Sequence, residues 1–215
     1  MKKILITGGS QGIGSSLVEK LSGQDRLIYF TYNKHKKEAL ELAKKTGAVP
    51  IKCDLLLDED ISNLSKCCGS VDILINNAGV SEIKLFTDIT NADWDKVLDV
   101  NLKGAFLVTR EFLPKMISKK WGRIINISSM WGIIGASCEV QYSASKAGLI
   151  GMTKALAKEV GPSNITVNCI APGLINTTMN ANIDSKCLDE MVENTPMQRI
   201  GTCDDIANAV EFLIS

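Results

Sequence analysis

Residues 3–21 have the sequence KILITGGSQGIGSSLVEKL, in which an apolar run, a glycine-rich turn and an amphipathic run follow one another. The apolar run KILIT (3–7) has the length of a buried strand. The glycines that follow permit a sharp turn, and the pattern from about residue 12 to 22 predicts a helix. Strand, tight turn and helix in this order predict the first half of a βαβ unit.

The same rhythm continues along the chain. Strands are expected at residues 3–7, 26–32, 49–53, 71–76, 122–128 and 164–171, and helices at about 12–22, 36–46, 58–67, 90–118, 139–160, 184–193 and 203–214. Strands that alternate with helices predict a parallel sheet covered on both faces. With right-handed crossovers and no linker, repeat or low-complexity segment, we expect a single α/β domain of residues 1–215 with a doubly wound, Rossmann-type sheet.

Charge and composition exclude several classes of partner. The 24 Lys and Arg residues balance the 24 Asp and Glu residues, which argues against binding of nucleic acid or an anionic membrane through bulk charge. No apolar run has the length of a membrane span, and the N-terminus turns polar too soon for a signal peptide. We therefore expect a cytoplasmic protein.

The cysteines and the histidine do not form a metal-binding pattern. Seven cysteines are scattered without a CxxC pair, and His35 stands among lysines. No metal site is expected, and the cysteines are interpreted as reduced thiols, most of them small buried apolar side chains.

The glycine turn is a candidate nucleotide site. Gly8, Gly12 and Gly14 follow a T-G-x-x-x-G-x-G pattern between the first expected strand and helix. Glycines there let backbone N–H groups approach a pyrophosphate, which the helix N-terminus also attracts. A tight strand-to-helix connection without a ligand is the alternative.

The end of the second expected strand indicates which dinucleotide fits. Asn33, Lys34, Lys36 and Lys37 precede the first carboxylate, Glu38. An acidic residue would hydrogen-bond the ribose 2′-OH of NAD, whereas this basic turn suits the 2′-phosphate of NADP. The alternative is a solvated start to the next helix.

Further motifs fall at the carboxyl ends of strands or in the adjacent helices, where α/β sheets bind ligands. They are NNAG (76–79), Asn101 in DVNLKGAF, Ser128 and Ser129 in INISSMWG, Tyr142 and Lys146 in YSASKAG, and APGLINTT (171–178). Tyr142 and Lys146 are four residues apart, so a helix places them on one face.

This ordered set resembles the short-chain dehydrogenase/reductase family over residues 2–215. The resemblance implies a Rossmann sheet, usually of seven parallel strands, and hydride transfer with a nicotinamide cofactor. A seventh strand would follow the helix expected at 203–214, and the sequence carries no residues for it.

The resemblance assigns catalytic roles to four residues. Tyr142 is expected to donate a proton to the carbonyl oxygen, and Lys146 to lower the pKa of Tyr142 and hydrogen-bond the nicotinamide ribose. Ser129 would hold the substrate oxygen, and Asn101 would anchor a water that connects Lys146 to solvent. Ser128 could end its strand through a backbone bond, and Asn101 could be a helix-surface amide.

The resemblance also implies contacts with NADP(H). These are expected at Gly8, Ser10, Gln11, Gly12, Ile13, Gly14, Asn33, Lys34, Asp54, Asn77, Ala78, Gly79, Tyr142, Lys146, Pro172, Gly173, Ile175 and Thr177. Two alternatives stay open: Asp54 could cap a loop, and the NNAG asparagines could tie a strand to a helix.

Within the family, the chain resembles the 3-oxoacyl-acyl-carrier-protein reductases of fatty-acid synthesis, in NNAG…NLKGAF, GRIINISS, YSASKAG and TPMQRIGTCDDIANAVEFL. Those enzymes reduce a ketone on an acidic carrier protein, which they dock on basic residues. Lys119 and Lys120 match one such position, and Ser163 stands where another basic residue is expected.

A second resemblance is to reductases of a 5-aminopentanone on elongation factor P, carried by Cys138 and Glu139 in GASCEV. Glu139 could pair with a substrate amine or act as a first-turn helix carboxylate. A non-catalytic NADP-binding protein is a third alternative, although Ser129, Tyr142 and Lys146 are all present.

The segment Thr178–Pro196 is expected to cover the substrate, with Met179, Leu188 and Met191 suited to an acyl chain, and Met130 and Trp131 to line the pocket. The resemblance further implies a homodimer or homotetramer whose first interface uses the helices 90–118 and 139–160.

Overall fold

Six parallel strands form the centre of the molecule, whose computed structural model describes residues 1–23, 25–180 and 184–215. The strands are β1 (Lys2–Ile6), β2 (Arg26–Tyr32), β3 (Val49–Lys52), β4 (Ile73–Asn76), β5 (Gly122–Ile127) and β6 (Ile165–Ile170). Their order is β3-β2-β1-β4-β5-β6, so the order reverses between β1 and β4. The predicted doubly wound sheet is confirmed, with strand ends within two residues of the expected ones.

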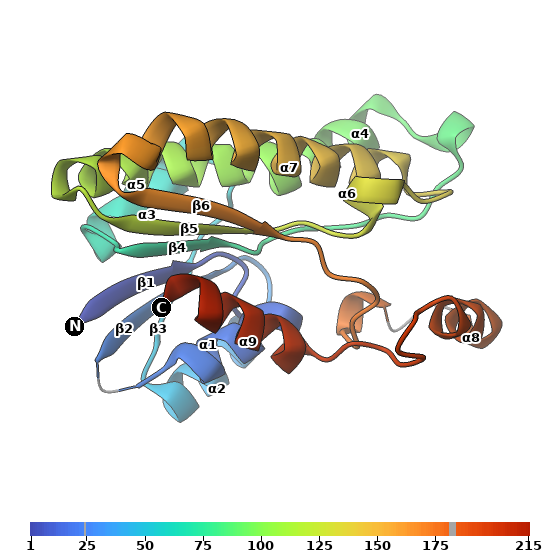
Figure 1. Ribbon diagram of the computed structural model, residues 1–215, viewed down its shortest axis with the longest axis horizontal. Coiled ribbons are helices and arrows are strands. Elements are labelled where there is room, and N and C mark those ends of the chain that lie inside the picture. Colours follow the sequence, from blue (N-terminus) through green and yellow to red (C-terminus); the bar gives the residue numbers. More distant parts are fainter. Residues whose placement is uncertain (24, 181–183) are drawn as a thin grey trace.

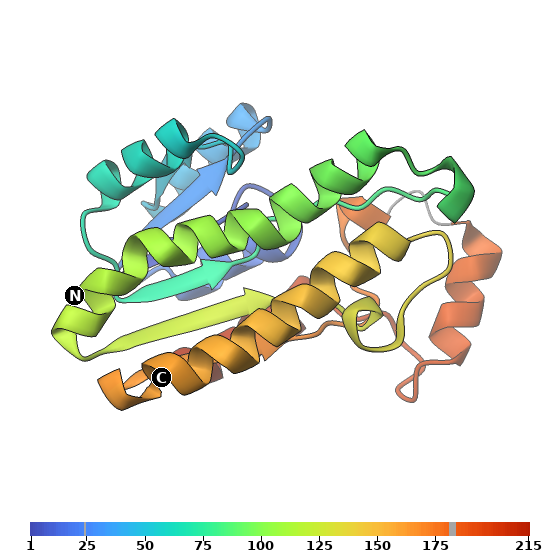
Figure 2. The ribbon, with the colours of Figure 1, turned by 90° about the horizontal axis from the view of Figure 1, so that it is seen from above.

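Helices cover both faces of the sheet (Figure 1). The helices are α1 (Gly12–Leu21), α2 (Lys36–Thr46), α3 (Asp58–Cys68), α4 (Asn91–Leu98), α5 (Gly104–Lys119), α6 (Trp131–Ile134), α7 (Val140–Val160), α8 (Ser185–Glu193) and α9 (Cys203–Ile214). In Figure 1, α1, α2 and α9 lie below the sheet, and α3, α5 and α7 lie above it. Figure 2 shows α5 and α7 side by side along the upper face.

Alternating residues of each strand build the two cores. Ile4 and Ile6 face the layer of α1 and α9, whereas Leu5 faces the layer of α3 and α5. The same alternation separates Ile73 and Ile75 from Leu74. Successive side chains of a strand point to opposite faces, so a strand that is buried on both sides must be apolar throughout. All six of these side chains are at most 3% exposed.

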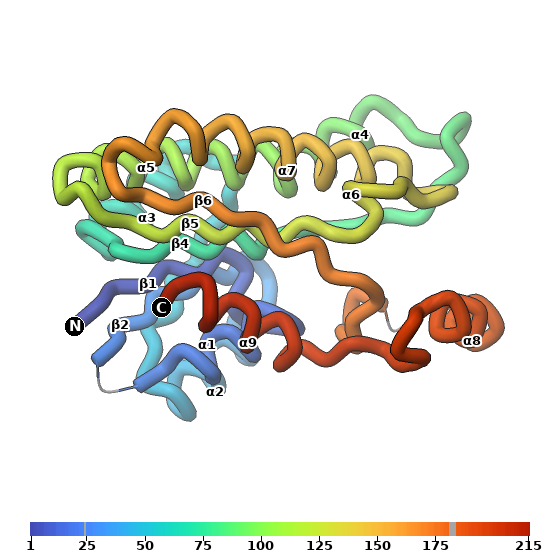
Figure 3. The backbone as a smooth tube through the Cα atoms, viewed as in Figure 1, coloured from blue at the N-terminus to red at the C-terminus, as the bar shows by residue number. Residues whose placement is uncertain are grey.

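The chain leaves β6 at the carboxyl edge and crosses to the lower layer (Figure 3). It passes through α8, which stands apart from the sheet at that edge, and returns as α9. Helix α9 packs on α1, with Ala207 and Val210 fully buried. Within the described residues β6 has no partner on its outer side, so it forms one edge of the sheet.

The helical segment predicted at about 90–118 is present over residues 91–119, but a π-helical turn divides it into two α-helices. Helix α4 starts with a capping box between Thr90 and Asp93, and a π-helical turn at Asp99–Lys103 separates it from α5. The wide turn points Asn101 into the interior, where it is 1% exposed and hydrogen-bonds Val80. Such π turns are rare and are frequently found at functional sites.

The shortest helices were not predicted, because they span too few residues to show a helical period of apolar residues. Helix α6 has one turn, and 3-10 turns occur at Phe86–Asp88, Gly161–Ser163 and Thr178–Asn180. Gly132 of α6 explains the close packing of α6 on α7, since a Cβ there would lie 2.7 Å from the carbonyl carbon of Lys146.

The cysteines are free thiols. Burial raises the pKa of Cys53 and of Cys68 to about 12, with further contributions from neighbouring acidic groups and thiols. A thiol with such a pKa stays protonated and unreactive at neutral pH. These two cysteines therefore act as small apolar side chains of the core. The prediction that most of the seven are buried is wrong, because Cys67 and Cys187 are exposed and the other three are half-buried.

Among the described residues, no helix combines the length and apolar character needed to cross a membrane.

Candidate active site

A cleft of about 660 Å³ lies at the carboxyl edge of the sheet, where the strand order reverses. Ser129 and every residue expected to contact a cofactor line this cleft. They are Gly8, Ser10, Gln11, Gly12, Ile13, Gly14, Asn33, Lys34, Asp54, Asn77, Ala78, Gly79, Tyr142, Lys146, Pro172, Gly173, Ile175 and Thr177. The fold thus brings segments from six strand ends to one site.

The glycine turn after β1 leaves no space for side chains. A Cβ on Gly14 would lie 2.1 Å from the Gly8 carbonyl oxygen, and one on Gly8 would lie 2.8 Å from the Ala78 Cα. Gly8 and Gly12 also have positive φ angles, of 65° and 54°. Glycine is required here because L side chains rarely adopt such angles.

The N-terminus of α1 opens on the same cleft. Its N-cap residue, Gln11, makes no side-chain cap hydrogen bond, so the first-turn N–H groups keep their capacity to bind a ligand. Bare backbone and free N–H groups suit the pyrophosphate of a dinucleotide. The residues present therefore fit a nicotinamide dinucleotide.

Asn77 ties β4 to β1. Its amide donates to the carbonyls of Thr7 (3.1 Å) and Gly8 (3.0 Å), and the Thr7 hydroxyl accepts from the backbone N–H of Asn77 and of Ala78. The structural role that the sequence left open for Asn77 is therefore present, and it holds the glycine turn in place beside the cleft.

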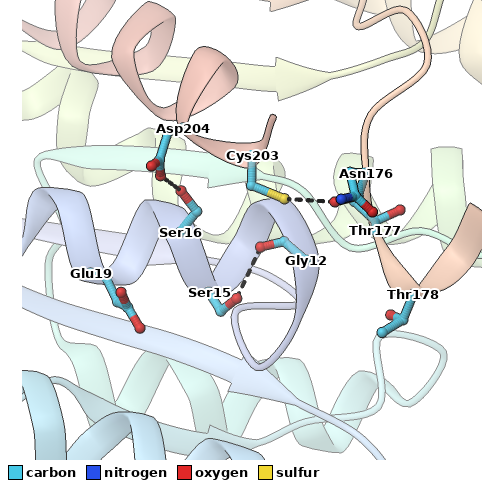
Figure 4. A pocket seen from close by; sticks show the side chains of 9 residues that line it. All are labelled: Gly12, Ser15, Ser16, Glu19, Asn176, Thr177, Thr178, Cys203 and Asp204. Carbon is cyan, nitrogen blue, oxygen red and sulfur yellow. Dashed lines mark hydrogen bonds between the residues drawn. The ribbon is translucent and has the colours of Figure 1, made fainter. Parts of the chain in front are cut away.

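A smaller hollow of about 400 Å³ adjoins this cleft and is lined by residues of α1, of the segment after β6 and of the start of α9 (Figure 4). Ser16 donates to Asp204 at 2.7 Å, and the Cys203 thiol lies 3.5 Å from the Asn176 carbonyl oxygen. These contacts fasten α9 and the segment after β6 to α1, which places Thr177 beside Gly12.

Polar groups gather where β2 and β3 end. Asn33, Lys34 and His35 line the cleft, and the Gln11 amide lies 3.2 Å from His35 Nδ1. His35 was not predicted as a site residue, because only the turn of the chain brings it next to Gln11. Asp54 accepts from the N–H of Leu56 at 3.0 Å, so it caps a loop and also lines the cleft.

The two serines after β5 have different roles. The Ser128 hydroxyl donates to the Lys146 carbonyl at 2.9 Å, and its N–H donates to the Ile170 carbonyl. The Ser129 hydroxyl accepts from the Trp131 N–H at 3.2 Å, which leaves its proton to be donated. The geometry favours Ser129 as the residue that meets a substrate, in agreement with the sequence-based choice.

Lys146 is buried in α7. Its ammonium donates to the Ile127 carbonyl at 2.8 Å and lies 5.6 Å from the centre of the Tyr142 ring. Burial lowers the pKa of Lys146 to about 8. The side chain is therefore mostly cationic at pH 7 and loses that charge about one pH unit above it.

Tyr142 departs from expectation in one respect. Burial raises its pKa, the Ser129 hydroxyl offsets part of this rise, and the charge of Glu139 adds to it. The expected lowering by Lys146 is not seen, since desolvation dominates and the ammonium is turned to the Ile127 carbonyl. Tyr142 is thus a protonated phenol at neutral pH, which is the form that donates a proton.

Asn101 lies directly behind the cleft. It accepts from the Val80 N–H at 2.7 Å and donates to the Val80 carbonyl and the Ser145 hydroxyl. A Cβ on Gly79 would lie 3.3 Å from both Asn101 Oδ1 and Lys146 Nζ. The surface-amide alternative is excluded by this burial, and a side chain at position 79 would crowd both the amide and the ammonium.

A buried polar chain that was not predicted supports this end of the sheet. Asn76 donates to Thr109 and to Asn126, which in turn donates to Thr153 of α7. Asn76 and Asn126 are paired in register on β4 and β5. In the sequence, the only sign of this hydrogen-bonded network was an asparagine near the carboxyl end of each of the two strands.

The substrate end of the cleft is largely apolar. Met130 and Trp131 line it, as predicted. Met179 and Met191 also line it, as predicted for the segment Thr178–Pro196, but the prediction for Leu188 is wrong, because this residue is not part of the lining. Residues 181–183 of that segment lie outside the described residues.

Lys119 and Lys120 lie at the opposite edge of the sheet, where α5 ends and β5 begins. Lys119 bonds Ser70 and Asp72 there, at 3.2 Å and 3.1 Å. A carrier protein docked on these lysines would not stand beside the cleft of the same chain.

Comparison with known proteins identifies the family. A model of the family described as short chain dehydrogenase matches residues 2–188. The 3-oxoacyl-acyl-carrier-protein reductase FabG of Aquifex aeolicus (strain VF5) is 42% identical over 100% of this chain and 90% of its own length. FabG of Rickettsia prowazekii (strain Madrid E) is 43% identical over 100% and 89%. Nodulation protein G of Rhizobium sp. (strain N33) is 38% identical over the same shares. The chain therefore belongs to the short-chain dehydrogenase family of oxidoreductases, whose members use nicotinamide cofactors.

Proposed function

We propose that the protein reduces a ketone to a secondary alcohol with NADPH, as a reductase of the 3-oxoacyl-acyl-carrier-protein type. The observation that carries this proposal is the position of Ser129, Tyr142 and Lys146 along one wall of the cleft that the glycine turn opens. A protonated phenol, a hydroxyl donor and a cation beside a site that fits a dinucleotide would supply the proton and the polar contacts for reduction of a carbonyl group by a bound nicotinamide.

A bound nicotinamide would supply the hydride. Tyr142 donates its proton to the carbonyl oxygen, for which its raised pKa keeps it protonated. Ser129 holds that oxygen and stabilises the charge that develops on it. Lys146, held by the Ile127 carbonyl 5.6 Å from the centre of the Tyr142 ring, would hydrogen-bond the nicotinamide ribose.

Several groups support NADPH over NADH. Asn33 and Lys34 line the cleft at the end of β2, and no carboxylate precedes Glu38 in this turn. Glu38 is half exposed, and its Oε1 lies 3.9 Å from His35 Nδ1, so its charge is turned toward the histidine. A 2′-phosphate would meet an ammonium and an amide here instead of a carboxylate.

The class of substrate is supported by the relatives and by the lining of the cleft. The Aquifex and Rickettsia proteins are named as reductases of 3-oxoacyl groups on acyl carrier protein. Met130, Met179 and Met191 offer flexible apolar surface, which suits an acyl chain. Acyl carrier protein and a role in fatty-acid synthesis follow as part of the proposal.

One observation favours a second substrate. Glu139 lines the cleft near Tyr142, so a ketone that carries an amine, such as the 5-aminopentanone on elongation factor P, would find a carboxylate there.

We also expect a homo-oligomer that uses α4, α5 and α7. Phe106 and Ile117 of α5 are 44% and 41% exposed, which leaves apolar surface on this helix for a second copy.

The test is NADPH oxidation by the purified protein with an acetoacetyl thioester, beside elongation factor P that carries the ketone. NADH is compared at the same concentrations, and Tyr142→Phe is the control. Turnover of either ketone that Tyr142→Phe abolishes supports a ketone reductase and chooses its substrate. NADPH binding without turnover of any ketone would contradict the proposal.

A further inference from the structure

The buried polar chain behind the cleft has two ends, one on α5 and the other on α7. Asn76 of β4 donates to Thr109 of α5 at 2.9 Å and to Asn126 of β5 at 2.8 Å. Asn126 donates to Thr153 of α7 at 2.8 Å, and the Thr153 hydroxyl donates to the Leu149 carbonyl at 2.7 Å. All four polar side chains are at most 5% exposed.

The α7 end of this chain lies on the same face of the helix as the groups expected to act in the reaction. Lys146 is four residues after Tyr142, and Thr153 is seven residues after Lys146. Both spacings place side chains on one face of a helix. Thr153 is about 10 Å from Lys146 along the axis, at 1.5 Å per residue. A rotation or shift of α7 at Thr153 would therefore move Lys146 and Tyr142 as well.

The half of α7 that carries Tyr142 is held largely by polar groups. Between residues 140 and 150 the buried side chains are those of Gln141, Ser145, Lys146 and Leu149, of which only Leu149 is apolar. Apolar packing is non-directional, whereas a satisfied buried hydrogen bond specifies one arrangement of the groups that it joins. The orientation of this half of the helix should therefore depend on hydrogen bonds.

The end of β5 supplies such bonds from adjacent residues. Asn126 and Ser128 are two positions apart, so they face the same side of the extended backbone. Asn126 donates to Thr153, and the Ser128 hydroxyl donates to the Lys146 carbonyl at 2.9 Å. Ile127, between them, accepts from the Lys146 ammonium at 2.8 Å. The bond between Asn126 and Thr153 therefore extends the contact that holds Lys146 in place.

We propose that Thr153 is a positioning residue, whose hydrogen bond with Asn126 fixes the catalytic half of α7 against β5. Through this bond Thr153 places Tyr142 and Lys146 for the reaction. The inference rests on the proposed function and deepens it. Thr109, at the other end of the same chain, stabilises the core and does not affect the reaction. Position matters to this degree because a displacement of about 1 Å can lower a rate by about 10²-fold.

The experiment compares the two ends of the chain. Thr153→Val and Thr109→Val each remove one hydroxyl and keep a side chain of nearly the same volume, so each leaves a buried asparagine N–H without its acceptor. Thr153→Ser keeps the hydroxyl. For each variant, kcat and KM are measured with NADPH and an acetoacetyl thioester, and the midpoint of unfolding is measured in urea. The pKa of Lys146 is measured by NMR titration of ¹³C-labelled lysine, with Lys146→Arg to assign its signal.

Thr153→Val should lower kcat by about tenfold and leave KM nearly unchanged, as expected for a displacement of less than about 1 Å. Thr153→Ser and Thr109→Val should stay within about twofold of the wild type. Both valine variants should lower the urea midpoint to a similar extent, since each loses one buried hydrogen bond. In Thr153→Val alone, water should reach Lys146, so that its pKa, which burial lowers to about 8, rises by about half a unit or more.

The neighbours of Lys146 do not titrate in the same range. Tyr142 lies on the same helix and Cys169 on β6, and burial raises the pKa of both, so both are neutral near pH 8. Glu139, whose charge acts on Tyr142, is the same in every variant. A shift of the lysine signal in Thr153→Val therefore reports the surroundings of Lys146.

Equal kcat values and equal Lys146 pKa values in the two valine variants would overturn the inference, because Thr153 would then only stabilise the fold. Absence of turnover in the wild type contradicts the proposed function instead, and the titration of Lys146 still compares the two ends. Where a valine variant does not fold, Thr153→Cys and Thr109→Cys take its place, because a thiol accepts hydrogen bonds only weakly.

Discussion

The two ends of the cleft are built from different chemical groups. The end beside β1 presents backbone, because Gly8 and Gly14 leave no space for a Cβ and α1 keeps its N–H groups free of a side-chain cap. The end beside β5 presents side chains, namely the Ser129 hydroxyl, the Tyr142 phenol and the Lys146 ammonium. Binding at the first end depends on the shape of the backbone, and chemistry at the second end depends on the protonation states of side chains.

The two ends should therefore be sensitive to different substitutions. An added methyl group should damage the backbone end by steric overlap, whereas a removed oxygen should damage the side-chain end without changing the shape. Cofactor affinity and the chemical step should therefore respond to separate substitutions.

The largest effect is expected for Tyr142→Phe. Loss of the proton donor should lower kcat by about 10³-fold while the affinity for NADPH changes little, since general acid catalysis contributes 10²–10⁴-fold. Single-turnover kinetics and NADPH titration measure the two quantities. An equal loss in affinity and in kcat would show that Tyr142 holds the cofactor rather than the proton.

The opposite end is tested by Gly14→Ala. Its Cβ would meet the Gly8 carbonyl oxygen at 2.1 Å, so the turn must move and NADPH affinity should fall by about 10²-fold. Gly151→Ala is the matched control, because that helical glycine has nothing within 4 Å of its Cβ. The control should keep full affinity and gain about 0.5–1 kcal/mol of stability from helix propensity. If Gly14→Ala binds NADPH normally, the backbone end is not a dinucleotide site.

A finer comparison uses the neighbouring serines. Ser129→Ala should lower kcat by about 10- to 10²-fold through loss of a donor to the carbonyl oxygen. Ser128→Ala removes the hydrogen bond to the Lys146 carbonyl and should lower the free energy of unfolding by about 1 kcal/mol. Its effect on kcat should be smaller than that of Ser129→Ala. Steady-state kinetics and urea unfolding separate the two. A larger kcat loss in Ser128→Ala would reverse the assignment.

The smallest effect concerns pH. Lys146 has a pKa lowered to about 8, so it is cationic below that pH and neutral above it. The kcat/KM for the ketone should therefore fall about tenfold per unit as pH rises beyond 8. Tyr142, with its pKa raised, remains protonated in this range. In Lys146→Arg the guanidinium stays charged, and the fall should move to higher pH at a lower overall rate. If the fall of kcat/KM above pH 8 is the same in Lys146→Arg as in the wild type, another group causes it.

Much of this architecture could be predicted because it depends on local patterns. The glycines of residues 8–14 and the spacing of Tyr142 and Lys146 are visible in the sequence. The raised pKa of Tyr142 could not be predicted, since burial is a property of the packed fold. The hydrogen bond between Asn76 and Asn126 depends on the register of β4 and β5. The sequence of either strand alone does not show which residue of the other strand it pairs with.

The π-helical turn at Asp99–Lys103 has a consequence for chain length. A π turn takes up one extra residue in a single wide turn, so α5 keeps its rotational phase relative to α4. Deletion of one residue in this turn would restore a regular helix and leave Phe112 and Met116 in the core, but it would move Asn101 away from Val80 and Ser145. Such a deletion should therefore lose far more activity than thermal stability. The extra residue serves the site and not the core.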